Sequence, residues 1–266
     1  MPLFDFCFNF TSSIFRNNEE GFIQRAFDAD VNHFLVAGLD PEDSQLALEL
    51  AQRYQKNMYT TAGVHPHMAK NWHDDTLKVL RELADNDRVK AIGEAGLDFN
   101  RNFSTHEQQE YAFRQQIELA ISIQKPLFLH ERDAHESFFS ILSEYKNDIG
   151  PTVVHCFTGD EKALENYLTM DLYIGITGWI CDERRGSHLH ALVKTIPEDR
   201  LLIETDAPYL FPRTFKPRPK KMTNEPAYLA HIAEQIAYHR GDSLDKLSDY
   251  TMSNSLRFLG ITDTPT

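Results

Sequence analysis

The sequence contains few cysteines and no long hydrophobic run. Its three cysteines, Cys7, Cys156 and Cys181, lie far apart, and an odd number of distant cysteines does not suit a disulfide framework. No run approaches the roughly 18 apolar residues that suggest a membrane-spanning helix. The N-terminus also lacks the charged start and apolar core of a secretion signal. We therefore expect a protein of the reducing cytoplasm without a membrane-spanning segment.

Positive charge is also scarce. The chain has 27 Lys and Arg residues against 40 Asp and Glu residues, which gives a net charge of −13. Because phosphate affinity comes largely from Lys and Arg, this balance argues against a protein that coats nucleic acid. It does not exclude an enzyme whose cleft is locally basic.

Short runs rich in β-branched and aromatic residues alternate with segments of helical period along the chain. We expect strands at residues 3–10, 33–38, 58–64, 90–98, 126–131, 152–157, 172–178 and 201–206. Helical periodicity is clear in 41–56 and in 105–124, which opens with a capping-box pattern, Thr105-x-x-Gln108. In the second of these, Tyr111, Ile117, Leu119 and Ile121 are expected along the apolar side.

This alternation is typical of parallel βα units. Eight units in about 250 residues favour an α/β fold in which the strands close into a (β/α)8 TIM barrel. An open doubly wound sheet is the alternative, but no GxGxxG pattern follows the first strand. Because no linker or repeat divides the chain, we expect one domain over residues 1–266.

The first expected strand, LFDFCFNF, alternates phenylalanine with small polar residues. In a parallel barrel the outer face of each strand is covered by helices, so both faces are buried. We expect the phenylalanines to point outward and Asp5, Cys7 and Asn9 to point into the barrel.

Several expected strands end in residues that can bind a cation. Active sites of such barrels lie at the carboxyl ends of the strands, where we expect five ligand-capable residues to converge: Glu94, Asp98, His130, His155 and Asp206. One histidine at a strand end usually has a structural role, but the same pattern on four strands indicates a metal site. Imidazoles with carboxylates suit Zn²⁺ or Mn²⁺, and the oxygen ligands also permit Mg²⁺.

Other residues near these strand ends allow more than one role. His65 and His67 could contact substrate or metal, or could simply close a loop. Glu204 lies one layer deeper than Asp206, which suits support of a ligand. Cys156 is out of phase with His155, so we expect it to be buried outside the barrel.

The loops after the strands are locally basic. They carry Arg101, Arg132, Arg184 and Arg213, the last within the run PRTFKPRPKK. Arginine matches phosphate oxygens with two parallel hydrogen bonds, so we expect these residues to bind substrate. Trp179, Phe211 and Phe215 lie near these arginines in sequence and are candidates for stacking on bases.

Six blocks of the chain resemble the TatD family of metal-dependent deoxyribonucleases: AGVHPH, IGEAGLDFNR, FLHERDA, VVHCFTG, YIGITGW and LLIETDAPYL. The resemblance extends over essentially the whole chain. Two further segments, FNFTSS and GWICDERRG, resemble one bacterial branch of the family rather than its paralogues.

The resemblance implies a barrel of the amidohydrolase-like type and metal-dependent hydrolysis of DNA. It implies 3′→5′ exonuclease action that prefers single strands, extends to RNA and serves DNA repair or degradation. The expected cation is Mg²⁺, with Mn²⁺ and Zn²⁺ as alternatives. Matched motif by motif, the ligands are Glu94, His130 and His155, with Asp206 as a ligand or proton acceptor and Glu94 also catalytic. We expect a monomer.

One departure from the family pattern lies in the first strand. Most members carry His-x-His where this chain has Cys7-Phe8-Asn9. Asn9 offers only a neutral oxygen, and a Cys7 thiolate suits Zn²⁺ far better than Mg²⁺. We therefore expect one firmly held cation and a weak or absent second site. The same bacterial branch shares the lack of these histidines, so the departure does not weaken the resemblance.

Two other functions are compatible with the same residues. A metal-dependent hydrolase of a small amide or lactone could use the same site, since a barrel does not fix the substrate. A non-catalytic binding protein with a structural metal is a further alternative, although structural sites normally have no open coordination position. The basic loops favour a phosphate-rich substrate.

Overall fold

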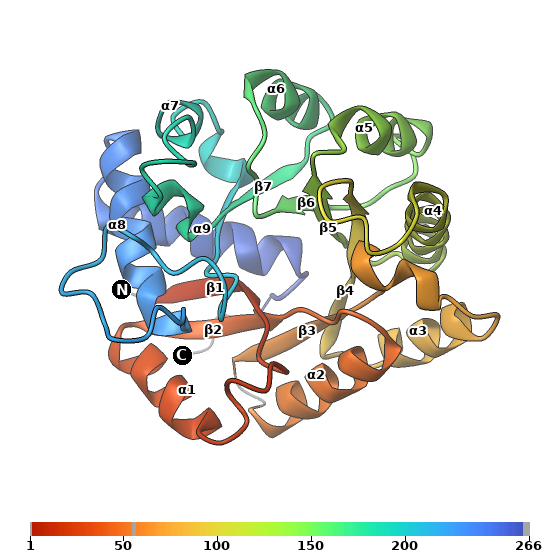
Figure 1. Cartoon of the computed structure of the whole chain (residues 1–266), viewed down its shortest axis with the longest axis horizontal. Helices are drawn as coiled ribbons and strands as arrows, with labels where there is room; N and C mark the ends of the chain where they lie inside the picture. The colour runs from red at the N-terminus through yellow and green to blue at the C-terminus, as the bar shows by residue number, and fades with distance from the viewer. Residues whose placement is uncertain (1, 55–56, 263–266) are drawn as a thin grey trace.

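The structure is a computed structural model, and it describes residues 2–54 and 57–262. Eight parallel strands follow one another in chain order and form a barrel that the helices surround (Figure 1). All eight expected strands are present, and the predicted fold class is confirmed. The strands are β1 Leu3–Phe8, β2 Val31–Val36, β3 Met58–Ala62, β4 Val89–Asp98, β5 Leu127–Arg132, β6 Thr152–His155, β7 Tyr173–Ile176 and β8 Leu201–Ile203.

The helices follow the strands as a βα pattern requires. They are α1 Glu19–Asp28, α2 Pro41–Arg53, α3 Thr76–Ala84, α4 His106–Ile123, α5 His135–Glu144, α6 Glu161–Thr169, α7 Leu189–Leu192, α8 Leu229–Arg240 and α9 Leu244–Phe258. Short 3₁₀ turns are η1 Pro66–Asn71, η2 Gly178–Cys181, η3 Glu198–Arg200 and η4 Pro226–Tyr228. Among the described residues, none of the helices is long and apolar enough to cross a membrane.

The two helices expected from periodicity are present, and each is capped at its N-terminus. Asp40 accepts a hydrogen bond from the backbone N–H of Asp43, and the capping box of Thr105 with Gln108 is present. Residues 55 and 56, the last two of the expected 41–56 helix, lie outside the described residues. The expected apolar side of α4 is wrong at Tyr111, whose side chain is exposed.

The apolar core has two layers. The inner cluster takes residues from all eight strands, including Phe6, Leu35 and Phe128, so it fills the barrel. Phe258 and Leu259, at the end of α9, belong to this cluster. The outer cluster lies between the strands and the helices, and both layers position the strand ends rigidly.

The phenylalanines of β1 divide between these two layers. Phe8 and Phe10 pack in the outer cluster as expected, whereas Phe4 and Phe6 pack in the inner one, so that part of the prediction was wrong. The pairing register with β2 shifts between Asp5 and Phe8. Such an irregularity breaks the strict alternation of faces on which the prediction rested.

The barrel closes between β1 and β8 with few backbone bonds. Asp206 N–H donates to the Cys7 carbonyl, and Asn9 N–H donates to the Ala207 carbonyl, both at 2.9 Å. The buried Asp5 carboxyl adds two bonds, because it accepts from Thr205 N–H at 2.8 Å and from Thr205 Oγ1 at 2.5 Å. A side chain thus completes the seam where β8 has only three residues.

Candidate active site

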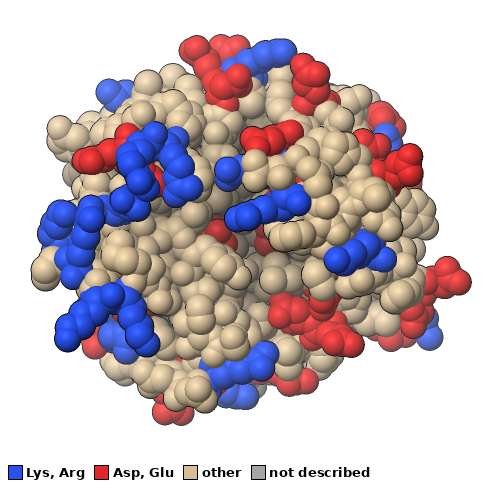
Figure 2. All heavy atoms as spheres, viewed as in Figure 1, with Lys and Arg blue, Asp and Glu red and all other residues tan. Residues whose placement is uncertain are grey.

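A cavity of about 590 Å³ opens at the carboxyl ends of the strands. Figure 2 shows it as a hollow near the centre of this face, with acidic atoms at its bottom. The structure brings most of the sequence-predicted site residues to its walls: Glu94, His130, His155, Asp206, His65, His67 and Arg101. A slightly larger cavity, about 650 Å³, lies beside α5 and α6, but its lining includes four carboxylates that would repel phosphate: Glu131, Asp133, Glu136 and Asp160.

Glu94 reaches the cavity because β4 is irregular where it lies. The pairing of β4 with β5 shifts between Ile92 and Ala95, so Gly93 and Glu94 form a bulge of the kind that re-aims a side chain. Gly93 has a φ of +144°, and a Cβ there would lie 2.1 Å from the Phe128 carbonyl oxygen. Only glycine permits this close approach.

One oxygen of Glu94 lies among several imidazoles. Its Oε1 is 2.8 Å from His155 Nε2 and 2.9 Å from His130 Nδ1, and these two nitrogens are 3.4 Å apart. About 3.0 to 3.4 Å separates neighbouring ligand atoms around a cation held at roughly 2.1 Å. His130 Nε2 is buried without a hydrogen-bond partner. The donor set and its spacing therefore fit a divalent cation.

His65 approaches the same carboxylate as a hydrogen-bond donor. Its Nδ1 accepts from the backbone N–H of His67 at 3.1 Å, so in the neutral ring the proton lies on Nε2. That Nε2 is 3.3 Å from Glu94 Oε1. Burial lowers the pKa of His65 to about 4, although the nearby Glu94 carboxylate opposes this shift. The ring is therefore neutral at pH 7. Although His65, Glu94 and His130 group closely enough to share a cation, this tautomer suits His65 for orienting Glu94.

Asp98, which was expected at the same face of the barrel, organises the next loop. Its Oδ2 lies 2.6 Å from His67 Nε2, and its Oδ1 accepts from the backbone N–H of Asn100 and Arg101. Burial opposes ionisation, but the nearby His130 ring and hydrogen bonds from His67 and Arg101 hold the pKa of Asp98 well below its usual range. Asp98 therefore fixes two of the residues predicted to bind substrate.

Asp206 extends into the cavity from the end of β8. Its φ of +56° is left-handed, a conformation that non-glycine residues adopt mainly at constrained sites. Asn9 Nδ2 donates to Asp206 Oδ1 at 2.8 Å, so Asn9 positions this carboxyl. Burial, with the nearby Glu94 and Glu204 carboxylates, raises the pKa of Asp206 to about 7 although His155 opposes the shift. A carboxyl of this pKa suits proton exchange near neutrality.

The remaining predicted arginines gather beside the cavity. Arg132 and Arg185 lie over the Trp179 ring, 5.1 and 4.4 Å from its centre. The buried Asp182 carboxyl lies 3.0 Å from Arg185, 3.5 Å from Arg184 and 3.9 Å from Arg213. We call Arg132, Arg184, Arg185 and Arg213 the arginine patch. Lys and Arg side chains gather at the upper left of this face in Figure 2, where α7 lies in Figure 1.

The aromatic residues expected to stack on bases are not the exposed ones. Trp179 and Phe211 are buried, and Phe215 packs against Tyr228. By contrast, Phe103 and Tyr209 line the cavity with 55% and 57% of their surface exposed. The sequence signal that could have found them is their position. Phe103 lies in LDFNRNF, five residues after Asp98, and Tyr209 lies in DAPY, three residues after Asp206.

Cys156 also differs from its prediction. It has a φ of +47° and lines the cavity, with Sγ 3.6 Å from Thr177 Oγ1. β6 ends at His155, so the alternation of strand faces no longer applies one residue later. Glu204 is buried as expected and accepts a hydrogen bond from the Cys156 backbone N–H.

A buried glutamine of α4 was missed entirely. Gln116 Oε1 accepts from Val64 N–H at 2.7 Å, and its Nε2 donates to the Val64 carbonyl at 3.0 Å. These bonds hold the loop that carries His65 and His67. A polar residue on the apolar side of a helix was the only sequence signal.

Comparison with known proteins is consistent with this geometry. Residues 4–260 match the family model described as TatD related DNase. The chain is 48% identical over 259 residues to a 3′-5′ ssDNA/RNA exonuclease TatD of Erwinia amylovora, covering 97% of this chain and 100% of that one. It is 49% identical over 255 residues to a protein of the same description from Pectobacterium carotovorum, covering 96% and 98%. A solved TatD homolog from Escherichia coli superposes with a TM-score of 0.87 at 27% identity, covering 99% and 98%.

Proposed function

Because the chain belongs to the family of TatD related DNases, we propose that it is a metal-dependent 3′→5′ exonuclease of single-stranded DNA and RNA. The observation that carries the proposal is the convergence of Glu94, His130, His155 and Asp206 on one cavity beside the arginine patch. The cluster suits a cation, and the patch suits a chain of phosphates.

We assign the cation to Glu94, His130 and His155, with Asp206 beside them. A bound divalent cation supplies Lewis acidity toward the phosphate and lowers the pKa of a water molecule. Mg²⁺ is our proposed ion, since oxygen-rich sites of this kind accept it; Mn²⁺ and Zn²⁺ remain alternatives.

The chain's own groups then direct the hydrolysis. A water oxygen bonds to phosphorus, the bond from phosphorus to the leaving sugar oxygen breaks, and the proton of the water passes to Asp206. Asn9 holds the Asp206 carboxyl for this step. The leaving sugar oxygen takes up a proton from solvent, and Asp206 returns its proton to solvent. His65, whose Nε2 lies 3.3 Å from Glu94 Oε1, helps to orient that carboxylate.

The walls of the cavity support a preference for single strands. Phe103 and Tyr209 expose their rings at the cavity, where an unpaired base could stack on either. Arg101 lies in the same cavity, and the arginine patch continues outside it for the following phosphates. A base that is paired in a duplex would have to separate before it could enter.

Three further proposals concern the whole chain. Residues 1–266 would form one domain, supported by a single sheet that runs from β1 to β8. The reducing cytoplasm suits the three free cysteines. A monomer is proposed and is tested by sedimentation.

The test is digestion of a 5′-labelled single-stranded oligonucleotide with Mg²⁺, with EDTA, and with Glu94→Gln. We expect a ladder that shortens from the 3′ end, loss of the ladder in EDTA, and at least a 100-fold lower rate for the variant, which should remain folded. Glu82→Gln, an exposed residue of α3, is the matched control and should keep the wild-type rate.

Three results would count against the proposal. A full rate for Glu94→Gln would place the chemistry elsewhere. Immediate release of labelled mononucleotide would show that digestion begins at the 5′ end instead of the 3′ end. No cleavage with any divalent cation would turn the assignment to a small-molecule hydrolase.

A further inference from the structure

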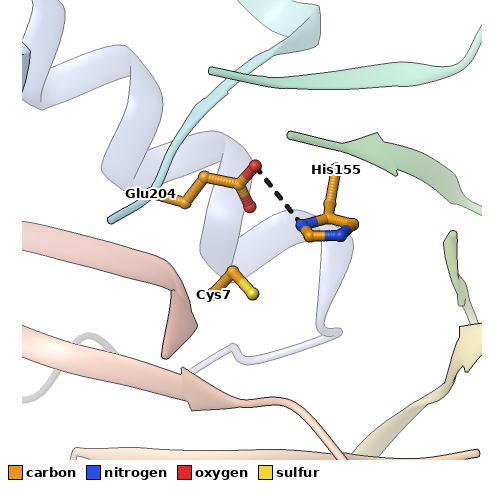
Figure 3. Close-up of side chains that lie close together, drawn as sticks. All are labelled: Cys7, His155 and Glu204. Carbon is orange, nitrogen blue, oxygen red and sulfur yellow. Dashed lines mark ion pairs between the residues drawn. The ribbon is translucent and has the colours of Figure 1, made fainter. Parts of the chain in front are cut away.

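Beneath the cavity floor lies a second cluster of possible ligands, two of which, Cys7 and Glu204, take no part in the proposed hydrolysis. Cys7 Sγ, a nitrogen of His155 and an oxygen of Glu204 all lie within 4.8 Å of one another (Figure 3). The three side chains come from β1, the end of β6 and the residue after β8, and at most 2% of each is exposed. His155 is shared, because its Nε2 faces Glu94 while its Nδ1 faces Glu204.

Two atoms of this cluster are buried without a hydrogen-bond partner. They are His155 Nδ1 and Glu204 Oε2. Burying an unpaired carboxylate oxygen is costly, and each such group in a native structure needs an explanation. The 3.6 Å between His155 Nδ1 and Glu204 Oε1 is too long for a hydrogen bond. It is close to the roughly 3.4 Å that separates nitrogen and oxygen ligands across a tetrahedral zinc ion.

The surroundings fix Glu204 in this position. A Cβ on Gly175 would lie 2.6 Å from Glu204 Oε1, so the carboxylate occupies space that only glycine leaves open. The other contact of Oε1 is the backbone N–H of Cys156. Oε2 therefore remains as a buried acceptor beside a thiol and an imidazole.

From these contacts we propose that Cys7, His155 and Glu204 form a binding site for a thiophilic divalent cation such as Zn²⁺, which lies below the catalytic site and shares His155 with it. Thiolate with imidazole selects such ions over Mg²⁺. On binding, a metal–sulfur bond forms, the Cys7 S–H bond breaks, and the proton passes to solvent. The positive ion compensates the buried Glu204 carboxylate.

Occupation of this site has a consequence for the proposed nuclease, and this consequence rests on the proposed function. A neutral imidazole has one N–H and one lone pair. If His155 gives its Nδ1 lone pair to the lower ion, its Nε2 carries the proton and cannot bind the upper one. Thiophilic cations should therefore inhibit in competition with Mg²⁺.

The direct test uses Cd²⁺ alone, because thiolate binding to Cd²⁺ produces an ultraviolet charge-transfer band. Metal-stripped protein is titrated with Cd²⁺ in the absence of DNA. The double variant Cys156→Ser/Cys181→Ser keeps Cys7 as the sole thiol and should show the band at one equivalent. Cys7→Ser should lack it. Loss of a residue that only hydrogen-bonds to a metal ligand weakens metal binding about 10- to 100-fold. Because Glu204 is proposed as a direct ligand, Glu204→Gln should weaken Cd²⁺ binding at least that much.

The result that would overturn the site is absence of the band in the double variant, or its persistence in Cys7→Ser. Because the measurement needs no nuclease activity, its failure leaves the proposed hydrolysis untouched. In the competition assay, Cys7→Ser should raise the Cd²⁺ concentration that halves Mg²⁺-dependent cleavage by more than about tenfold. Equal inhibition of wild type and variant would contradict the shared role of His155.

Discussion

Asp206 combines a buried carboxyl, a left-handed backbone and a hydrogen bond from Asn9. Its pKa of about 7 means that, without a cation, the carboxyl holds a proton below neutrality. Binding of a cation must release that proton, so the two compete. Apparent Mg²⁺ affinity should therefore fall as the pH drops below 7, by up to about tenfold per pH unit for one released proton.

Calorimetric Mg²⁺ titrations of the wild type and Asp206→Asn between pH 6 and 8 measure this effect. The variant cannot titrate at this position and should show a flatter dependence with weaker binding at pH 8. If the Mg²⁺ affinity of the two proteins changed equally with pH, Asp206 would not belong to the cation site.

At the same scale, Gln116 shows how one side chain holds a loop. Gln116→Leu would leave both backbone groups of Val64 unpaired, and the loop that carries His65 and His67 would shift. Misplacement by about 1 Å can cost roughly 100-fold in rate. We expect kcat to fall by about 10- to 100-fold, measured where the variant is fully folded. Gln115→Leu, one residue earlier on α4, is the control and should change kcat little.

At the scale of elements, the β1–β8 seam depends on one side chain. Asp5→Ala would leave the N–H and the hydroxyl of Thr205 without their buried acceptor. Each of the two unpaired groups costs roughly 1–3 kcal/mol, so the free energy of unfolding should fall by about 2–6 kcal/mol.

Urea unfolding measures this change, with Asp249→Ala as the control because Asp249 lies exposed on α9. The control should stay within about 0.5 kcal/mol of wild type. If Asp5→Ala were equally stable, backbone bonds alone would close the barrel.

At the scale of the whole molecule, an acidic protein places a basic patch beside an acidic cavity. The net charge of −13 disfavours unspecific contact with nucleic acid, while the arginine patch offers local phosphate binding. Arg184→Ala/Arg213→Ala should weaken binding of single-stranded DNA. Each lost phosphate contact reduces the salt slope by about 0.7, so the slope should fall by about 1.4.

Fluorescence anisotropy with a labelled oligonucleotide in EDTA, over a series of salt concentrations, measures this slope. Arg185 remains beside Asp182 in the double variant, so the buried carboxylate keeps a partner. Lys78→Ala is the control, since α3 lies across the barrel from α7 (Figure 1). An unchanged slope in the double variant would make the patch an ordinary solvated surface.

The sequence by itself determined the eight strands, the capping box of α4, and the set of strand ends that meet at the cavity. These follow from local periodicity and from the rule that parallel strands in a barrel end at one face. Glu94, His130, His155 and Asp206 could be found together for this reason. Their roles as ligands and proton acceptor remain predictions.

Only the tertiary structure decided how each side chain is directed. The register shift in β1 sent Phe4 and Phe6 inward, the end of β6 turned Cys156 into the cavity, and packing buried Trp179 while Phe103 stayed exposed. Bulges and left-handed residues change the direction of a side chain, but they leave no signal in the hydrophobic periodicity of the sequence. The pairing of Cys7 with His155 and Glu204 likewise joins residues up to 197 positions apart, which only the closed barrel brings into contact.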